Sequence, residues 1–316
     1  MTGELLPHPG TGEMFPSPVP PGTGWPGDPA DEQTPVAHSA ADVVALAADA
    51  KNLLDIDARI SVCRACPRLV EWRERAAETK RASFANQPYW GRPVTGFGGD
   101  FAKLLIMGLA PAANGGNRTG RMFTGDQAGD WLFRALHRAG LATRSEVDHA
   151  GDGQKLFGVR MLSAVRCAPP ENKPSIEERD CCAGWLDAEF ARLLPFARAV
   201  VALGAFGWDA TLGAVRRSGG TVPTPKPKFG HGQIAVLHTA DGKPLNVIGC
   251  YHPSQQNTFT GRLTEQMIDD VLSGGRNSRA SVGPAAAPGA DGAPSVRCTT
   301  VTHTSSEWDG SLNHTP

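Results

Sequence analysis

Asp126 and His252 are the two side chains best placed by type and position to do chemistry. Asp126 ends a glycine-rich run, 108–126, that follows an apolar run at 103–108, and His252 follows a second apolar run at 245–250. A carboxylate can hold a water molecule or stabilise a cation, and an imidazole can donate a hydrogen bond to a developing anion. Each has a simpler interpretation, because Asp126 can be a helix N-cap and His252 a structural histidine.

The glycine-rich run also offers groups that suit a nucleotide. Its glycines allow the backbone to approach a ligand closely, Arg118 and Arg121 can contact phosphate, and Phe123 offers a flat face to a base. One alternative is the phosphate-binding loop of a nucleotide enzyme, but neither a GxGxxG nor a Walker pattern fits. A second alternative is that Phe123 is a core residue.

Four of the seven cysteines form a pattern that suits a metal site. Cys63 and Cys66 are spaced as CxxC, Cys167 follows a predicted strand, and Cys182 lies on the next predicted helix. Four thiolates suit either a 4Fe–4S cluster or a zinc ion, and spacing does not exclude Cys181 as the fourth ligand. A redox pair or plain buried thiols remain open alternatives. Cys250 reads as a core residue and Cys298 lies in the C-terminal tail.

Strands alternate with helices along the central part of the chain, which indicates an α/β fold with a mainly parallel sheet. Predicted strands lie at 103–108, 158–165, 199–204, 234–238 and 245–250, and predicted helices at 39–60, 68–79, 127–139, about 20 residues from Ser175, 205–216 and 262–272. Ligands bind at the carboxyl ends of parallel strands. The polar loops 109–126, 166–174 and 251–261 should therefore converge on one site.

Composition limits the folded part and the class of partner. Residues 1–37 and 275–316 are rich in Pro, Gly and Ser without apolar periodicity, so we expect two disordered tails around one domain at 38–274. Seven of the 32 acidic residues lie in the first fifty, which contain no Lys or Arg. The rest therefore carries 31 basic against 25 acidic residues, a net charge of +6 that fits a polyanionic partner.

The chain shows neither an 18-residue apolar run nor a signal-peptide pattern. We therefore expect no membrane contact and a cytoplasmic protein, associated with the nucleoid in a bacterium. No helix stands out as an interface, so we expect a monomer.

Four motifs in one order carry a family resemblance. They are CRACPRL at 63–69, GLAPAANGGNRTGRMFTGD at 108–126, CAPPENKPS at 167–175 followed by Cys182, and YHPSQQNTFTGRLT at 251–264. Together they resemble the uracil-DNA glycosylase superfamily, specifically its iron–sulfur family 5 (UDGb-type) enzymes. The resemblance implies a doubly wound α/β/α sandwich. It also implies removal of uracil and other deaminated bases, such as hypoxanthine, from double-stranded DNA, and no metal in the reaction itself.

The resemblance also assigns roles. It implies a structural 4Fe–4S cluster on Cys63, Cys66, Cys167 and Cys182, and it is what favours Cys182 over Cys181. His252 would donate to O2 of the departing base, and Asp126 would hold the water and stabilise the sugar cation. Other branches carry an acid or Asn where this chain has Ala110, which makes Asp126 the expected carboxylate.

The remaining roles concern the base and the DNA backbone. Phe123 would stack on the base, and Asn117 is a lesser candidate for holding the water. Relatives often carry an Asn that reads the uracil edge where this chain has Ser163, so discrimination between bases should be looser. Expected DNA contacts are Arg118, Arg121, Pro169, Pro170, Lys173, Ser254 and Arg262. The role of His231, in a Pro- and Gly-rich stretch, is open.

Three other functions compete with this interpretation. A non-catalytic iron–sulfur or zinc module that binds nucleic acid would need neither Asp126 nor His252. A glycosylase that captures the sugar covalently would need a loop histidine, which 114–121 lacks. A redox enzyme would use Cys63 and Cys66.

Overall fold

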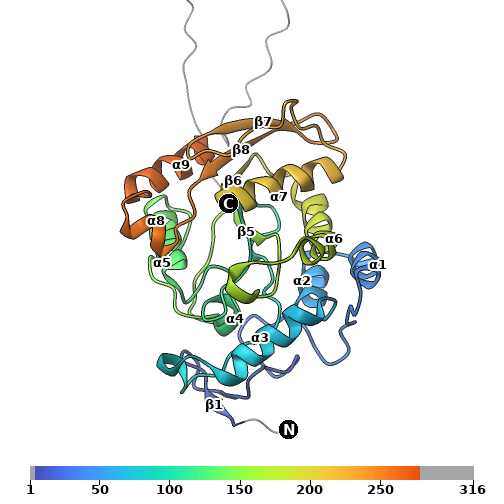
Figure 1. Ribbon diagram of the computed structural model, residues 1–316, viewed down its shortest axis with the longest axis vertical. Coiled ribbons are helices and arrows are strands. Elements are labelled where there is room, and N and C mark those ends of the chain that lie inside the picture. Colours follow the sequence, from blue (N-terminus) through green and yellow to red (C-terminus); the bar gives the residue numbers. More distant parts are fainter. Residues whose placement is uncertain (1–3, 278–316) are drawn as a thin grey trace, which may run out of the picture. The chain divides into compact units, whose positions relative to one another are not determined.

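The computed structural model describes residues 4–277, which form an α/β fold around a six-stranded sheet (Figure 1). The strand order is β3-β5-β4-β6-β8-β7, where the four inner strands are parallel and the two edge strands antiparallel. The bounds are β3 Phe97–Gly98, β4 Leu104–Gly108, β5 Val159–Ser163, β6 Ala199–Leu203, β7 Ile234–His238 and β8 Pro244–Cys250. The predicted mainly parallel sheet is confirmed.

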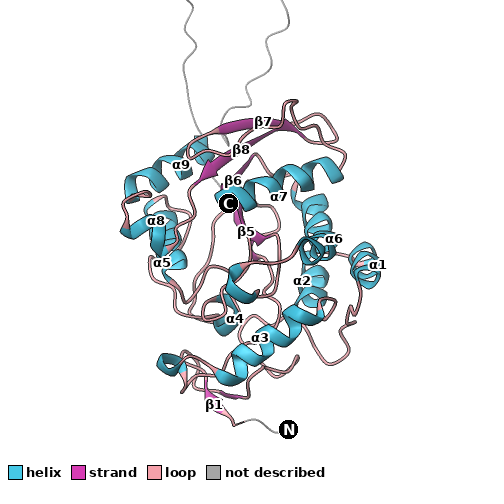
Figure 2. Ribbon diagram, in the orientation of Figure 1, coloured by secondary structure: helices cyan, strands magenta, loops and turns pink. Residues whose placement is uncertain are grey.

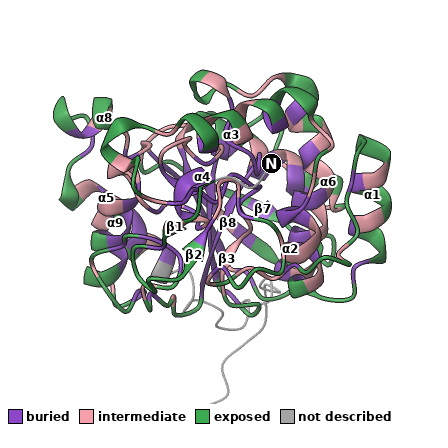
Figure 3. Cartoon of the chain, turned by 90° about the horizontal axis from the view of Figure 1, so that it is seen from below, coloured by how far each residue is buried: buried purple, intermediate pink, exposed green. Residues whose placement is uncertain are grey.

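Helices cover both faces of this sheet (Figures 2 and 3). One face packs against α1 (Ala40–Asp49), α2 (Leu53–Ser61), α6 (Ile176–Leu193) and α7 (Gly204–Arg217), and the other against α5 (Gln127–Arg138) and α9 (Glu265–Asn277). Helix α3 (Pro67–Thr79) contacts the short α4 (Gly116–Thr119), and α8 (Gln255–Phe259) follows β8. This is the expected α/β/α sandwich.

The side chains of the inner strands divide between two cores. In β4, Leu105 and Met107 enter the core under α6 and α7, whereas Leu104 and Ile106 enter the core under α5 and α9. Successive side chains of a strand point to opposite faces, so a strand covered on both sides is buried throughout and mostly apolar. Strands β4, β5 and β6 are buried at every position, and their buried polar residues are Arg160 and Ser163 of β5.

Local capping signals set several helix boundaries. Ser39 caps α1, and Ser175 forms a capping box with Glu178 at the start of α6. The single helix expected over 39–60 is wrong, because the chain breaks between α1 and α2. Asn52 there accepts a hydrogen bond from the Asp55 amide as a new N-cap. Asn favours that position strongly enough to end the preceding helix.

The expected disorder of residues 1–37 is wrong for the described residues 4–37. Phe15, Val19 and Trp25 are almost fully buried, and β1 (Leu6–Pro7) pairs with β2 (Met14–Phe15). Asp28 forms a buried ion pair with Arg92, with atoms 2.7 Å apart. The composition of this segment hides its order, because a few large side chains at irregular spacing are enough to anchor it.

The C-terminal boundary lies slightly beyond the expected one, because α9 continues to Asn277. The rest of the predicted tail, with Cys298, lies outside the described residues. Within residues 4–277, no helix is long and apolar enough to cross a membrane.

We predict that Trp25→Ala lowers the free energy of unfolding by roughly 3–5 kcal/mol, the usual cost of truncating a buried aromatic side chain. Trp25 is 3% exposed and its ring lies 5.9 Å from that of Trp90. Urea unfolding measures the change, with Leu5→Ala, at a 55% exposed side chain, as the control. A loss below about 1 kcal/mol would mean that the packing of this segment contributes little to the stability of the domain.

Candidate functional site

One cavity lies at the carboxyl ends of the parallel strands. Its volume is about 770 Å³. The loop after β4 supplies Leu109–Ala112, Met122, Phe123 and Asp126, and the start of α5 adds Gln127 and Ala128. The loop after β5 supplies Asn172, and the segment after β8 supplies His252 and Ser254–Gln256. The predicted convergence of the three loops is confirmed. Leu203, Gly204 and Phe206 add a fourth wall, from the junction of β6 and α7.

Asp126 lines this cavity and also caps α5. Its Oδ1 accepts a hydrogen bond from the Gly129 amide at 2.9 Å. Oδ2 points towards Gly115, where a Cβ would lie 2.3 Å from it, so any larger residue there would displace the carboxylate. Burial raises the pKa of this carboxyl above its ordinary value, against the lowering effect of the Gly129 amide. Both proposed roles, N-cap and cavity carboxylate, are thus compatible.

His252 lines the cavity across from the Asp126 loop. It lies two residues after the end of β8, and the Asn257 side chain donates to its backbone carbonyl at 2.8 Å. Burial lowers the pKa of its imidazole. The ring is therefore neutral at neutral pH and can donate one N–H into the cavity.

Phe123 adopts a left-handed backbone conformation in the cavity wall, with φ of 50°. Such a φ is strained for a bulky residue and persists only where the surroundings impose it. Gly108 makes room for its ring, because a Cβ there would lie 2.6 Å from Cζ of Phe123. The ring is half-buried, so both interpretations hold in part: it packs on the core and faces the cavity.

Asn117 and Ser163 do not line the cavity. Asn117 is fully buried, and its amide donates to the Arg73 carbonyl at 3.1 Å, which ties α4 to α3. The Ser163 hydroxyl donates to the Val165 carbonyl at 2.8 Å. Neither side chain is therefore placed to read a base in this structure.

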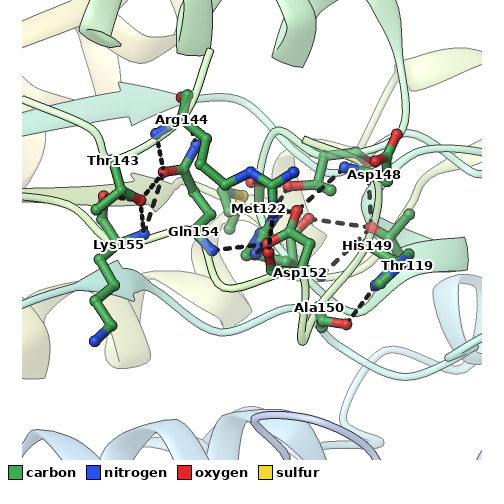
Figure 4. A network of polar contacts seen from close by, with 12 residues as sticks. Thr119, Met122, Thr143, Arg144, Asp148, His149, Ala150, Asp152, Gln154 and Lys155 are labelled. Atoms are coloured by element: carbon green, nitrogen blue, oxygen red, sulfur yellow. Dashed lines mark hydrogen bonds and ion pairs between the residues drawn. The ribbon is translucent and has the colours of Figure 1, made fainter. Parts of the chain in front are cut away.

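The expected phosphate contacts of Arg118 and Arg121 are wrong, because both guanidinium groups are buried and paired. Arg118 donates to Asn114, Gln87 and Gly125. Arg121 forms a two-pronged ion pair with Asp152. The Asp152 carboxylate also accepts from the Gln154 and Asp148 amides (Figure 4). These arginines shape the loop that carries Phe123 and Asp126.

The other expected DNA contacts divide into buried and accessible groups. Pro169 is buried, which contradicts a DNA contact, whereas Pro170 is half-buried. Lys173 is exposed and paired with Glu171 at 3.1 Å. Ser254 lines the cavity, and the exposed Arg262 places its guanidinium carbon 4.6 Å from the centre of the Tyr251 ring.

The structure adds lining residues that sequence reasoning missed. Arg81, Gln127, Asn172 and Phe206 all line the cavity. The Gln127 amide donates to the Thr258 hydroxyl at 3.0 Å, which links the Asp126 loop to α8 behind His252. Gln127 had a signal in its position beside Asp126, and Asn172 had one in the loop 166–174 that was expected at the site. Nothing in the sequence distinguishes Arg81 and Phe206 from surface residues.

Five cysteines line a second, small cavity between α3 and α6. They are Cys63, Cys66, Cys167, Cys181 and Cys182. Burial raises the pKa of the Cys66 thiol, and the neighbouring Cys181 raises it further. Two buried guanidinium groups share the wall: Arg73 donates to the Cys167 sulfur at 3.0 Å, and Arg166 precedes Cys167.

The geometry of this cavity does not itself show a metal site. Within residues 4–277, no group of three or more His, Cys, Asp or Glu side chains is placed to hold a metal ion. The wall does contain polar hydrogens without a protein partner, on Nε of Arg73 and on Nε and Nη1 of Arg166. Buried donors of this kind are costly unless something accepts from them.

Comparison with known proteins places the chain in a family. Residues 95–273 match the model of the uracil DNA glycosylase superfamily. The chain is 56% identical over 265 residues to the type-5 uracil-DNA glycosylase of Mycobacterium bovis, which covers 84% of this chain and 96% of the relative. It is 47% identical over 215 residues to that of Thermus thermophilus, covering 67% and 92%. With its sheet, its site and these similarities, the chain belongs to the uracil DNA glycosylase superfamily.

Proposed function

We propose that this protein is a DNA-repair glycosylase that hydrolyses the N-glycosidic bond of deoxyuridine in DNA and leaves an abasic site. The observation that carries the proposal is that Phe123, Asp126 and His252, from two loops far apart in sequence, line one cavity. The family and the type-5 names of the relatives support it. Because the reactive bond is inaccessible within stacked DNA, the nucleotide must rotate out of the duplex into this cavity.

His252 would stabilise the departing base. Negative charge grows on uracil as the bond to the sugar breaks, and a neutral imidazole that donates to O2 stabilises that charge. Burial, which lowers the pKa of His252, also strengthens such a hydrogen bond, because less water competes for it. A preorganised donor of this kind contributes about 10²–10³-fold in rate.

Asp126 would act on the sugar side. Gly129 occupies Oδ1, which fixes the carboxylate and leaves Oδ2 for a water molecule or for the oxocarbenium-like sugar. The raised pKa means that ionising this carboxyl costs free energy in the folded protein. That cost is offset in the transition state, where a cation develops nearby.

The substrate range should be broad. The Ser163 hydroxyl is taken by a backbone carbonyl, so it does not select one base edge. We therefore propose that hypoxanthine is also removed, and that the substrate is double-stranded DNA. Arg81, Lys173 and Arg262 are exposed charges from three segments and are the proposed phosphate contacts.

We further propose a monomeric, cytoplasmic enzyme. A monomer is supported because the large exposed apolar side chains lie on different elements, such as Val44 on α1, Phe206 on α7 and Phe259 on α8. The proposed cytoplasmic location agrees with the proposed DNA substrate.

We propose that the cysteine cavity holds a structural 4Fe–4S cluster on Cys63, Cys66, Cys167 and Cys182. The residues fit such a group: soft thiol ligands surround an apolar cavity, and Arg73 and Arg166, which line the same cavity, each carry buried N–H groups without a protein partner. A cluster held by four thiolates carries negative charge, which two guanidinium groups complement. The cluster would stabilise the fold, and His252 and Asp126 would perform the chemistry without it.

Incubation with duplex DNA that carries one U opposite G, without added metal, tests the proposed activity. We expect strand cleavage only after alkali, which marks an abasic site, and a single-turnover rate about 10²–10³-fold lower for His252→Ala. A gel that separates cut from uncut strands measures both. A wild-type protein that binds this duplex but cleaves neither it nor the hypoxanthine duplex would instead be a non-catalytic module.

Two substitutions separate the two roles of Asp126. Asp126→Asn keeps an N-cap acceptor and removes a buried charge, so we expect unchanged or higher stability with most activity lost. Asp126→Ala should lose activity and also about 0.5–2 kcal/mol of stability. Thermal unfolding and single-turnover rates measure the pair. If Asp126→Asn keeps the wild-type rate, Asp126 is only a cap.

Serine substitutions test the cluster and decide its fourth ligand. We expect Cys63→Ser, Cys66→Ser, Cys167→Ser and Cys182→Ser to yield little soluble protein with less iron and acid-labile sulfide per chain. Cys181→Ser should keep both, and so should Cys250→Ser, whose thiol lies outside the cavity. Iron loss in Cys181→Ser but not in Cys182→Ser would assign the fourth ligand to Cys181. If the purified wild-type protein contains zinc and no iron, the site is a zinc site and the proposed cluster is wrong.

A further inference from the structure

His231 lies beside the segment that carries His252. It belongs to the chain between α7 and β7, and its Nδ1 accepts a hydrogen bond from the Tyr251 amide at 3.1 Å. Its ring also packs on the Tyr251 ring, with centres 5.0 Å apart. Tyr251 directly precedes His252, so His231 contacts the backbone that holds the proposed donor.

This hydrogen bond fixes the charge and tautomer of His231. Nδ1 accepts only when it carries no proton, so the ring must be neutral with its hydrogen on Nε2. Burial lowers the pKa of His231, while the Met267 backbone and the charge of Asp270, both on α9, act in the opposite direction. The guanidinium carbon of Arg262 also lies near this pair, 4.6 Å from the centre of the Tyr251 ring.

Backbone hydrogen bonds fix the position of His231 itself. The Gly232 amide donates to the Gly249 carbonyl at 2.8 Å, and the Gly249 amide donates to the Gln233 carbonyl at 2.9 Å. A Cβ at Gly249 would lie 2.2 Å from the Gly230 carbonyl oxygen, so this close approach requires glycine. His231 is therefore carried on backbone anchored to the end of β8.

The segment that carries His252 is held from both sides. His231 accepts from the amide that precedes His252, and Asn257 donates to the carbonyl of His252 itself. Two fixed peptide groups define how the backbone turns from β8 into the cavity. The direction of the imidazole follows from that turn.

We propose that His231 is a positioning residue for the reaction, which holds the Tyr251–His252 backbone so that the His252 imidazole points at the departing base. This inference rests on the proposed function. A small misplacement of a reacting group can cost about 10²-fold in rate. Losing this one hydrogen bond should therefore slow bond cleavage about 10- to 100-fold while DNA binding changes little.

Two substitutions at His231 isolate the hydrogen bond from the packing of the ring. His231→Phe keeps an aromatic ring against Tyr251 but has no acceptor. His231→Asn places an amide oxygen near the position of Nδ1. We expect a 10- to 100-fold lower single-turnover rate for His231→Phe, with DNA affinity within about 2-fold, and recovery of most of that rate in His231→Asn.

His238→Phe is the matched control. The His238 side chain is exposed at the last residue of β7, and its hydrogen bonds with Thr221 are made by the backbone. A wild-type rate in His231→Phe would overturn the proposal. Equal losses in His231→Phe and His231→Asn, with lower melting temperatures in both, would reduce His231 to a structural residue.

The pH dependence gives a readout that packing alone would not move. As pH falls below neutral and through the lowered pKa of His231, its ring gains a proton. Nδ1–H then faces the Tyr251 N–H and the hydrogen bond is lost. The ratio of the wild-type rate to the His231→Asn rate should fall in that range. Asp126 and His252 are present in both proteins, so their effect on the rate cancels in this ratio. A ratio that does not change with pH would contradict the proposal.

Amide hydrogen exchange separates this inference from the proposed function. The Tyr251 amide should exchange faster in His231→Phe than in the wild type and at the wild-type rate in His231→Asn, whether or not the protein cleaves uracil-containing DNA. If the exchange pattern holds and no base is removed, the proposed function fails while the contact stands. If base removal is observed and Tyr251 exchange is unchanged in His231→Phe, only the positioning role fails.

Discussion

A buried network of four charges holds together the elements on which both cavities depend. Glu189 of α6 is fully buried and contacts two arginines, Arg160 on β5 and Arg166 just after it, and Arg160 also pairs with Asp57 of α2. Burial raises the pKa of Asp57 to about 6 despite the nearby Arg160. Removing one partner of such a network leaves an uncompensated buried charge, which costs about 3–5 kcal/mol. The network thus fixes where β5 ends and where the loop to Cys167 begins.

That loop connects the two cavities. It runs from Cys167 in the cysteine cavity to Asn172 in the candidate active site, and then enters α6 through the Ser175 capping box. This layout explains why we propose a structural role for the cysteine cavity and a catalytic role for the other. Sulfur ligands would stabilise the start and end of the loop region, while the carboxyl ends of β4 and β8 present the groups that do chemistry. Buried arginines serve the scaffold rather than the DNA.

The sequence predicts most of the fold because its signals are local. Apolar runs such as 103–108 and caps such as Ser175 need no knowledge of distant partners. Asp126 and His252 were found because they follow strands, and the carboxyl ends of parallel strands meet. Arg121 was misassigned because its partner, Asp152, lies 31 residues away, and nothing in one sequence tells a paired guanidinium from a free one. Ser163 was misassigned for a different reason, because its hydroxyl donates to the carbonyl of Val165, only two residues away, which a residue type alone does not reveal.

The packing of the N-terminal segment has a consequence for synthesis. Its partners lie far along the chain: the Tyr89 amide donates to Ser17 across 72 residues, and Trp25 packs against Gly120. A chain made from its N-terminus exposes Phe15, Val19 and Trp25 long before those partners leave the ribosome. These residues therefore cannot dock until about 120 residues are available, so the first part of the protein to be made is not the first to find its partners.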